Sequence, residues 1–254
     1  MLGLTGRKAI VTGAADGIGR AIAKRLAKEG CIVGVLDMNA DGARAACKAI
    51  EEEGGRAFPL HADISQYAAV HNAVEAFEAQ AGPTDLLVNN AGWDRTVAFL
   101  DSEPHFWEKV IAINLVGPLN VHHIVLRGMA ARGFGRVVNI ASDAGRVGSS
   151  GEAVYSSCKG GIIALTKTLA RELVSKGIIL NSVCPGPTDT AILRSFFEGP
   201  EGAKIAEGLK RAIPMRRFAV PEDYPGIVTF LLSDDAGFIT GQTLSVSGGL
   251  TMHG

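Results

Sequence analysis

Short apolar runs rich in β-branched residues alternate along the chain with longer segments whose apolar residues recur every three or four positions. The short runs predict buried strands, and the longer segments predict amphipathic helices. Strands are expected at 7–13, 31–37, 56–63, 84–90, 135–142, 177–186 and 242–249. Because alternating strands and helices form βαβ units with right-handed crossovers, we expect an α/β fold with a doubly wound, seven-stranded parallel sheet and helices on both faces.

The alternation breaks in one segment, 187–214, where three prolines and three glycines surround a short apolar helix candidate. Such a segment is typical of a mobile lid over a binding site. No repeat and no shift of composition marks a second domain, and single α/β domains commonly reach a length of 254 residues. We therefore expect one domain over 1–254, with 187–214 as a substrate lid.

The composition fits a globular protein with many tight turns, since 47% of residues are hydrophobic, 20% are charged and 32 are glycines. The formal net charge is −1 and the two signs are interspersed, which argues against a nucleic-acid surface. No run approaches the roughly 20 uncharged apolar residues of a membrane span. The first strand begins too early for a secretory signal. We expect a cytoplasmic protein without nucleic-acid or membrane partners.

The four cysteines lie far apart and form no CxxC pair, and the six histidines show no metal-ligand spacing. Neither a disulfide framework nor a metal site is therefore expected. Buried reduced thiols are the better interpretation of the cysteines.

A glycine-rich turn over 12–19 (TGAADGIG) follows the first strand and opens a helix. Its glycines let the backbone approach phosphate groups, and the helix N-terminus offers free N–H groups and a positive dipole end. The spacing is GxxxGxG and not GxGxxG, so a purely structural turn is the alternative. Asp37 ends the second strand, where its carboxylate can bind ribose hydroxyls or can cap a helix. The two features together predict a Rossmann-type dinucleotide site.

The charges near this site predict NAD as the cofactor. A 2′-phosphate on the ribose would meet Asp37, with Asp16 nearby and Met38 following in place of an arginine. Like charges should therefore exclude NADP. Asp63 ends the third strand and could bind the adenine amino group, or it could cap the helix that begins near Ser65.

Tyr155 and Lys159 are spaced i, i+4 in a long helical segment, so both side chains project from one face. A tyrosine that acts as a base near neutral pH needs its pKa lowered by roughly 2 to 3 units, about 3 to 4 kcal/mol. An ammonium about 4 Å away supplies on the order of 4 kcal/mol at an effective dielectric of about 20. A lysine assisted by a nicotinamide cation is therefore expected to suffice.

Two further polar residues are candidates for the same site. Ser142 ends a strand, where its hydroxyl can hydrogen-bond a substrate oxygen as charge develops on it. Asn114 is a polar residue inside an apolar helical run. Taken singly, either could be an ordinary buried polar residue with a satisfied partner, and YxxxK pairs occur by chance in many helices.

In combination these residues resemble a known family, the short-chain dehydrogenase/reductases, along the whole chain. The motifs that carry the resemblance are TGAADGIG (12–19), Asp37, Asp63, NNAG (89–92), Asn114, Ser142, Tyr155 with Lys159, and PGPTDT (185–190). The resemblance implies that Tyr155 is the general acid/base, that Lys159 lowers its pKa and binds the nicotinamide ribose, that Ser142 holds the substrate oxygen, and that Asn114 anchors a relay water. The cofactor-binding residues that it implies are Gly13, Asp16, Gly17, Ile18, Gly19, Asp37, Met38, Asp63, Ile64, Asn90, Ala91, Gly92, Tyr155, Lys159, Pro185, Gly186, Thr188 and Thr190.

The segments 89–94, 140–161, 184–193 and 233–254 resemble family members that oxidise a ring alcohol beside a thioester. This implies conversion of 2-hydroxycyclohexanecarboxyl-CoA to 2-ketocyclohexanecarboxyl-CoA. An apolar ring pocket and a positive rim for CoA phosphates are then expected. The ring-pocket and neighbouring substrate candidates are Trp93, Asp143, Arg146, Val147, Ser149 and Met215. The rim candidates are Arg95, Arg146, Arg194, Lys204 and Lys210, although scattered surface cations are ordinary.

Three other functions stay open. A 3-oxoacyl-carrier-protein reductase would share nearly every motif, although such enzymes usually prefer NADPH. A dehydrogenase of another cyclic or aryl-alkyl secondary alcohol fits as well. A non-catalytic nucleotide-sensing protein of the same fold would commonly lack the tyrosine or the lysine, and both are present here.

Two long helices expected near 105–132 and 153–175 have apolar residues on more than one side. One side can pack on the sheet and another on a partner subunit, or both can belong to a thick core. The family resemblance implies a homotetramer.

Overall fold

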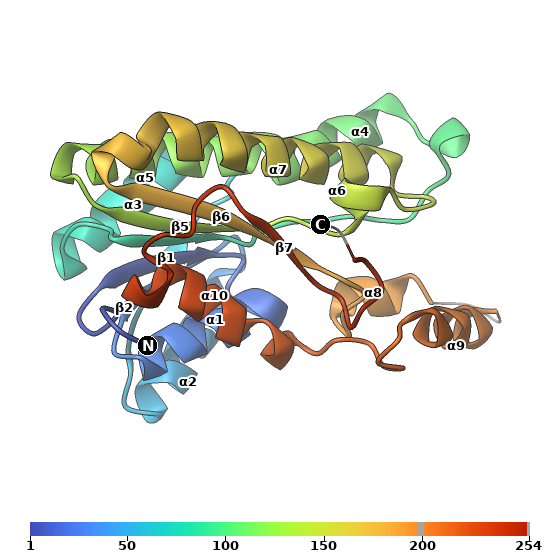
Figure 1. Cartoon of the computed structure of the whole chain (residues 1–254), viewed down its shortest axis with the longest axis horizontal. Helices are drawn as coiled ribbons and strands as arrows, with labels where there is room; N and C mark the ends of the chain where they lie inside the picture. The colour runs from blue at the N-terminus through green and yellow to red at the C-terminus, as the bar shows by residue number, and fades with distance from the viewer. Residues whose placement is uncertain (198–200, 253–254) are drawn as a thin grey trace.

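Seven strands pair in parallel in the order β3-β2-β1-β4-β5-β6-β7 in the computed structural model, which describes residues 1–197 and 201–252 (Figure 1). The strands are β1 (Lys8–Thr12), β2 (Ile32–Asp37), β3 (Arg56–His61), β4 (Leu86–Asn89), β5 (Gly135–Ile140), β6 (Ile178–Pro185) and β7 (Thr243–Val246). The strand order reverses between β1 and β4, and ligands of doubly wound sheets bind beyond the strand ends at such a reversal. The expected single-domain, Rossmann-type α/β fold is confirmed.

Helices cover both faces of the sheet, with α3, α4, α5 and α7 on one face and α1, α2 and α10 on the other (Figure 1). The longer helices are α1 (Gly17–Lys28), α2 (Ala40–Glu52), α3 (Tyr67–Ala81), α4 (Pro104–Ile111), α5 (Gly117–Arg132), α7 (Ala153–Leu173), α9 (Gly202–Ala212) and α10 (Pro225–Leu232). Alternate residues of one strand face opposite layers, so Ala9 and Val11 belong to the core under α1 while Ile10 belongs to the core under α5. Apolar residues are needed on both faces of such strands, which explains their unbroken apolar runs.

The long helix expected near 105–132 is interrupted. A π-helical turn, η2 (Ala112–Val116), separates α4 from α5, and Asn114 lies buried in it. By length and composition Pro104–Arg132 could also cross a membrane, and it is the one such candidate in the described part of the chain. Its α5 part packs Val121, Val125 and Met129 into the core beside the sheet, as a core helix does.

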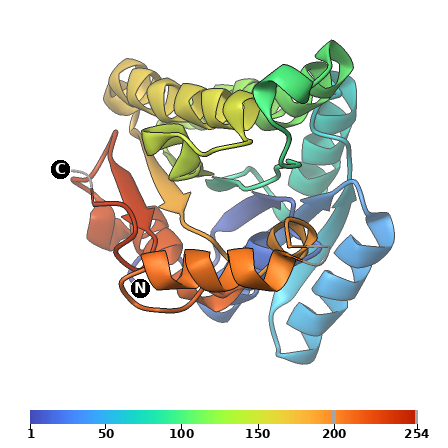
Figure 2. The same ribbon diagram turned by 90° about the vertical axis from the view of Figure 1, so that its right-hand side faces the viewer.

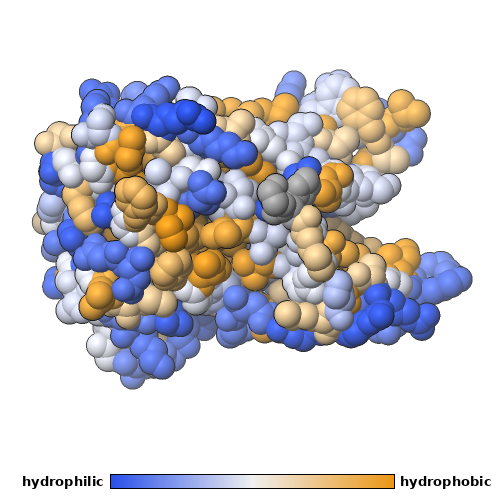
Figure 3. All heavy atoms as spheres, in the orientation of Figure 1, coloured by the Kyte–Doolittle hydropathy of each residue, from blue (hydrophilic) through white to orange (hydrophobic). Residues whose placement is uncertain are grey.

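Two short helices stand at the carboxyl ends of the strands, α6 (Ala144–Val147) after β5 and α8 (Ala191–Ser195) after β6. The structure places α4 and α6 on one side of this end and α8 and α9 on the other, and α9 lies across it (Figure 2). The molecular surface is hollowed between the two sides (Figure 3). The expected lid, 187–214, forms the second side, and residues 198–200 within it lie outside the described residues.

Candidate active site

The glycine-rich turn between β1 and α1 leaves no room for a side chain at two of its glycines. A Cβ atom on Gly19 would lie 2.2 Å from the carbonyl oxygen of Gly13, and one on Gly13 would lie 2.7 Å from the Cα atom of Ala91. Gly13 and Gly17 also have positive φ angles of 62° and 55°, which favour glycine. The turn therefore presents bare backbone at the start of α1, where a pyrophosphate fits.

Thr12 fastens a second turn, the one after β4, to this glycine-rich turn. Its hydroxyl accepts hydrogen bonds from the backbone N–H groups of Asn90 (3.0 Å) and Ala91 (3.1 Å). The Asn90 amide donates in return to the carbonyls of Thr12 (3.0 Å) and Gly13 (2.9 Å). Asn90 therefore uses its donors to support the glycine-rich turn, and neither this role nor that of Thr12 was predicted.

Asp37 lies beside the glycine-rich turn at the end of β2. Its two carboxylate oxygens accept hydrogen bonds from the N–H groups of Ala15 (3.0 Å) and Asn39 (2.9 Å). Each oxygen keeps a lone pair for a further donor such as a ribose hydroxyl. Asp37 thus orders the turn and still offers acceptors, whereas the residue that caps α2 is Asn39. Asp16 and Met38 are exposed nearby.

At the end of β3 the structure departs in part from the expected cofactor contacts. Asp63 accepts a hydrogen bond from the N–H of Ser65 (2.9 Å), so it forms the turn that leads to α3. The Ile64 side chain is buried against Gly117, where a Cβ atom would lie 2.5 Å from Ile64 Cδ1. Ile64 is therefore a core side chain, and only its backbone is left for a nucleotide.

Tyr155, Lys159 and Ser142 meet where β5 and β6 end. The first two project from α7, and Ser142 lies just beyond β5. The Ser142 hydroxyl lies near the Tyr155 hydroxyl and lowers its pKa. The Lys159 amine is buried, lies 5.5 Å from the centre of the Tyr155 ring and donates a hydrogen bond to the carbonyl of Ile140 (2.9 Å). A phenol, an alcohol and an amine are thus gathered for proton transfer at one oxygen.

Asn114 approaches this group from the π-helical turn. Its Oδ1 accepts a hydrogen bond from the N–H of Trp93 (3.2 Å), and its Nδ2 donates to the carbonyls of Trp93 (2.6 Å) and Val110 (2.9 Å). Gly92 fits between Asn114 and Lys159, since a Cβ atom there would lie 2.9 Å from Asn114 Oδ1 and 3.5 Å from Lys159 Nζ. The Asn114 side chain therefore holds the segment after β4 against the lysine.

Known oxidoreductases resemble this chain over nearly its whole length. A family model described as enoyl-(acyl carrier protein) reductase matches residues 13–251. Acetoacetyl-CoA reductase of Rhizobium meliloti (strain 1021) is 43% identical over 244 residues, 96% of this chain and 98% of that protein. The 3-oxoacyl-[acyl-carrier-protein] reductase FabG of Aquifex aeolicus (strain VF5) is 36% identical over 248 residues, 97% of this chain and 98% of that protein. The chain belongs to the short-chain dehydrogenase/reductase family.

A solved structure agrees with this assignment. A crystal structure of NAD+-bound xylitol dehydrogenase matches with a TM-score of 0.93 and 34% identity, over 97% of this chain and 100% of that one. This short-chain dehydrogenase/reductase is therefore an oxidoreductase that acts on CH–OH groups or the corresponding ketones. The relatives above are named for acetoacetyl-CoA and 3-oxoacyl-carrier-protein substrates, and not for the ring thioester expected from the sequence.

The surroundings of Tyr155 in this short-chain dehydrogenase/reductase oppose the expected acidity. Burial raises the pKa of Tyr155 well above its ordinary value, the charges of Glu152 and Asp94 raise it further, and the Ser142 hydrogen bond lowers it. Burial also lowers the pKa of Lys159 to about 8. The lysine charge therefore does not outweigh desolvation in the protein by itself, and the phenol keeps its proton unless further positive charge comes close.

The segment after β6 is held by Tyr224, a buried residue that was not predicted. The Thr188 hydroxyl hydrogen-bonds the carbonyl of Gly186 (2.8 Å) and the hydroxyl of Tyr224 (2.6 Å). Thr190 caps α8, and its methyl group faces the glycine-rich turn, since a Cβ atom on Gly17 would lie 3.8 Å from Thr190 Cγ2. The 186–190 segment thus borders the same cleft as the glycine-rich turn.

Four of the expected substrate residues lie in two environments. Trp93 packs edge-on against Phe106, with ring centres 5.9 Å apart, in a cluster that includes Tyr155. Val147, Ser149 and Met215 are exposed. Trp93 is therefore the one of these four that the structure packs beside the tyrosine.

Asp143 and Arg146, both expected to contact substrate, form hydrogen bonds with the last strand, β7. The Asp143 carboxylate accepts a hydrogen bond from the Ser245 hydroxyl of β7. Arg146 donates to the same hydroxyl (3.0 Å) and to the carbonyl of Thr243 (3.3 Å). The Asp143 N–H donates to the carbonyl of Pro185 (3.1 Å). These contacts join α6 to the last two strands, and the Asp143 side chain is buried.

The expected positive rim is largely neutralised by acidic neighbours. Three of its candidates form ion pairs, Arg194 with Asp189 (2.7 Å), Lys204 with Glu201 (3.9 Å) and Lys210 with Glu207 (2.8 Å). Arg95 lies over the ring of Phe106 at 5.3 Å. Exposed pairs of this kind are weak, so these side chains can still exchange partners with a phosphate.

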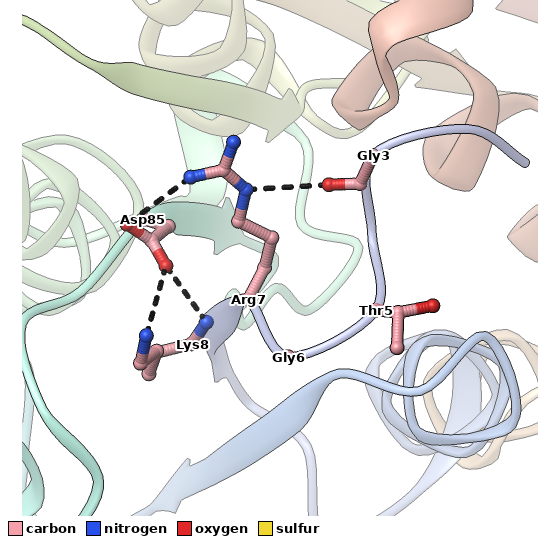
Figure 4. A pocket seen from close by; sticks show the side chains of 6 residues that line it. All are labelled: Gly3, Thr5, Gly6, Arg7, Lys8 and Asp85. Carbon is pink, nitrogen blue, oxygen red and sulfur yellow. Dashed lines mark hydrogen bonds and ion pairs between the residues drawn. The ribbon is translucent and has the colours of Figure 1, made fainter.

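A separate open cavity lies at the amino ends of β1 and β4, opposite this site (Figure 4). There Asp85 pairs with Arg7 and Lys8, each at 3.7 Å, and accepts a hydrogen bond from the Lys8 N–H (3.1 Å). These contacts join the starts of two strands. The cavity therefore has a structural explanation and takes no part in the chemistry.

Proposed function

We propose that this protein interconverts a secondary alcohol and a ketone with NAD, and that Tyr155 is the general acid/base. The observation that carries the proposal is the gathering of Tyr155, Ser142 and Lys159 at the sheet end that also bears the glycine-rich turn. In reduction Tyr155 donates its proton to the ketone oxygen, and in oxidation it accepts the alcohol proton. Ser142 holds that oxygen as its charge changes.

The residues present fit a nicotinamide dinucleotide. The bare backbone at Gly13 and Gly19 suits the pyrophosphate, and the Asp37 carboxylate suits the ribose hydroxyls. Asp37 and Asp16 both disfavour the 2′-phosphate of NADP, which supports NAD. NAD, when bound, accepts or supplies the hydride, and its oxidised ring brings the positive charge that Tyr155 otherwise lacks.

The proton of Tyr155 needs a route to solvent. Pro118 stands four residues after Asn114 and has no N–H, so the backbone carbonyl of Asn114 lacks its ordinary α-helical donor. The Asn114 amide is occupied by Trp93 and Val110. We therefore propose the Asn114 carbonyl, and not its side chain, as the acceptor for a relay water.

Two substrate candidates share one chemical pattern. The sequence points to 2-hydroxycyclohexanecarboxyl-CoA and the relatives point to acetoacetyl-CoA, and in both the reacting oxygen is borne by the carbon two bonds from a thioester carbonyl. We propose the ring substrate as the first candidate because Trp93 and Phe106 supply an aromatic wall beside Tyr155. The 3-oxoacyl thioesters are the second candidate.

The test compares NADH formation from 2-hydroxycyclohexanecarboxyl-CoA, 3-hydroxybutyryl-CoA, the free ring acid and cyclohexanol. Faster turnover of the ring thioester than of the other three supports the first candidate, and preference for 3-hydroxybutyryl-CoA supports the second. Equal turnover of free acid and thioester removes the CoA proposal. No reduction of NAD or NADP by any alcohol favours a nucleotide-sensing protein.

We also propose a cytoplasmic homotetramer with 187–214 as the lid. The four free cysteines are buried, as suits a reducing compartment. Ile111, Val116 and Leu119 are exposed apolar residues along α4, η2 and α5 that a partner subunit would cover. Light scattering after size-exclusion chromatography tests the assembly, and a monomer mass would contradict it.

A further inference from the structure

Asp94 is a buried carboxyl group with no role in the proton transfer described above. It follows Trp93 in the segment that Asn114 holds, and its residue is only 7% exposed. Its Oδ2 atom is buried and has no hydrogen-bond partner among the described residues. It lines a small cavity together with Tyr155, Glu152 and Phe106. A buried carboxylate oxygen without a partner is costly, so it calls for a proton or a ligand.

Glu152 approaches Asp94 from the other side of this cavity, just before α7 begins. The nearby Glu152 carboxyl raises the pKa of Asp94, and the charges of both groups act on Tyr155. Two adjacent carboxylates repel each other, so the pair is stabilised by one proton shared between the two groups. The Arg95 backbone N–H and the charge of Lys159 counteract the effect of burial on the pKa of Asp94. The pair therefore carries one proton and one negative charge.

We propose that the Asp94–Glu152 pair selects substrates that carry a neutral acyl group, such as a thioester or an ester, two bonds from the reacting carbon, and rejects free carboxylates. The inference rests on the proposed function, because it concerns the acyl group two bonds from the carbon whose oxygen exchanges a proton with Tyr155. A neutral acyl oxygen accepts a hydrogen bond from the shared proton. A carboxylate in the same place meets the negative charge of the pair in a site sheltered from water.

The test uses three alcohols that differ in this one group: 2-hydroxycyclohexanecarboxylate, its methyl ester and cyclohexanol. The double variant D94N/E152Q removes the charge of the pair and keeps its size and its donors. We expect its ratio of kcat/KM for the free acid to kcat/KM for the ester to rise at least about tenfold over that of the unchanged protein. The control D101N/E103Q makes the same two kinds of substitution at exposed residues and should leave the ratio unchanged.

A second measurement needs no variant. Burial and Glu152 raise the pKa of Asp94 to about 7, so the pair gains a second charge as the pH rises through that value. Between about pH 6 and about pH 8.5 the free acid stays ionised, so its kcat/KM relative to the ester should fall. A constant ratio over this range overturns the proposal, as does an unchanged ratio in a folded double variant. Turnover of cyclohexanol separates these outcomes from failure of the proposed function, in which none of the three alcohols is oxidised.

Discussion

The amine of Lys159 lies 5.5 Å from the centre of the Tyr155 ring and donates its hydrogen bond to the carbonyl of Ile140, at 2.9 Å, and not to the tyrosine hydroxyl. The lysine is therefore fixed to the end of β5 and influences the phenol only through its charge. Because burial raises the pKa of Tyr155 and lowers that of Lys159 to about 8, the protein by itself favours an uncharged tyrosine.

Replacing Tyr155 with phenylalanine should abolish turnover and leave cofactor binding nearly intact. The variant keeps the ring that packs with Trp93 and Phe106 and removes only the hydroxyl. Loss of a positioned acid/base costs about 10²- to 10⁴-fold in rate. Stopped-flow measurement of hydride transfer gives the rate, and fluorescence titration with NADH gives the affinity. A variant that retains more than about a tenth of the rate would show that another group carries the proton.

Ketone reduction should slow as the pH rises through about 8, where Lys159 loses its proton. Because burial lowers the pKa of Lys159, its amine is charged below that value and neutral above it. Lys159→Arg keeps the charge throughout this range, because a guanidinium does not titrate there. Ketone reduction by this variant should be slower than that by the unchanged protein at neutral pH, and its rate should not decline as the pH rises. An identical decline in both proteins would assign the titration to another group.

Asp37→Ala should relax the preference for NAD over NADP. Removing the carboxylate removes the repulsion of a 2′-phosphate, and a tenfold change in the ratio of the two kcat/KM values corresponds to about 1.4 kcal/mol. Asp37 also accepts hydrogen bonds from Ala15 and Asn39, so the alanine variant weakens binding of both cofactors. Asp37→Asn keeps an acceptor and loses the charge, which separates the two effects. A ratio that stays constant in both variants contradicts the charge argument.

The strand sequence was predictable because each strand is buried on both faces and must be apolar throughout. Ala9, Ile10 and Val11 divide between the two cores and leave a continuous apolar run that marks the strand. The glycine-rich turn could also be predicted, because its backbone leaves no room for side chains. A Cβ atom on Gly19 would lie 2.2 Å from the carbonyl oxygen of Gly13. Local spacing was enough to bring Tyr155 and Lys159 together on α7.

Partners far apart in sequence could not be predicted. The Thr12 hydroxyl accepts a hydrogen bond from the Asn90 N–H of another strand end, and the Thr188 hydroxyl bonds that of Tyr224 beyond the lid segment. No spacing along the chain predicts either contact. The contact of Asp143 with Ser245, more than a hundred residues away, was equally beyond prediction. The effect of burial on the pKa of Tyr155 could not be predicted for a related reason, because the depth of burial comes from the whole fold and not from the neighbouring lysine.

Asp94 should make the protein less stable as the pH rises from about 4 to about 7. In the unfolded chain this carboxyl loses its proton near pH 4, whereas burial raises its pKa to about 7 in the folded protein. The folded state therefore binds more protons over this interval, and its free energy of unfolding falls by up to about 1.4 kcal/mol per pH unit on account of this group. Urea unfolding followed by tryptophan fluorescence at several pH values measures the slope. Asp94→Asn should remove that part of it, whereas Asp101→Asn, at an exposed aspartate, should not. Parallel pH dependences for the unchanged protein and Asp94→Asn would mean that Asp94 is ionised in the folded state, and the shared proton beside Tyr155 would then be excluded.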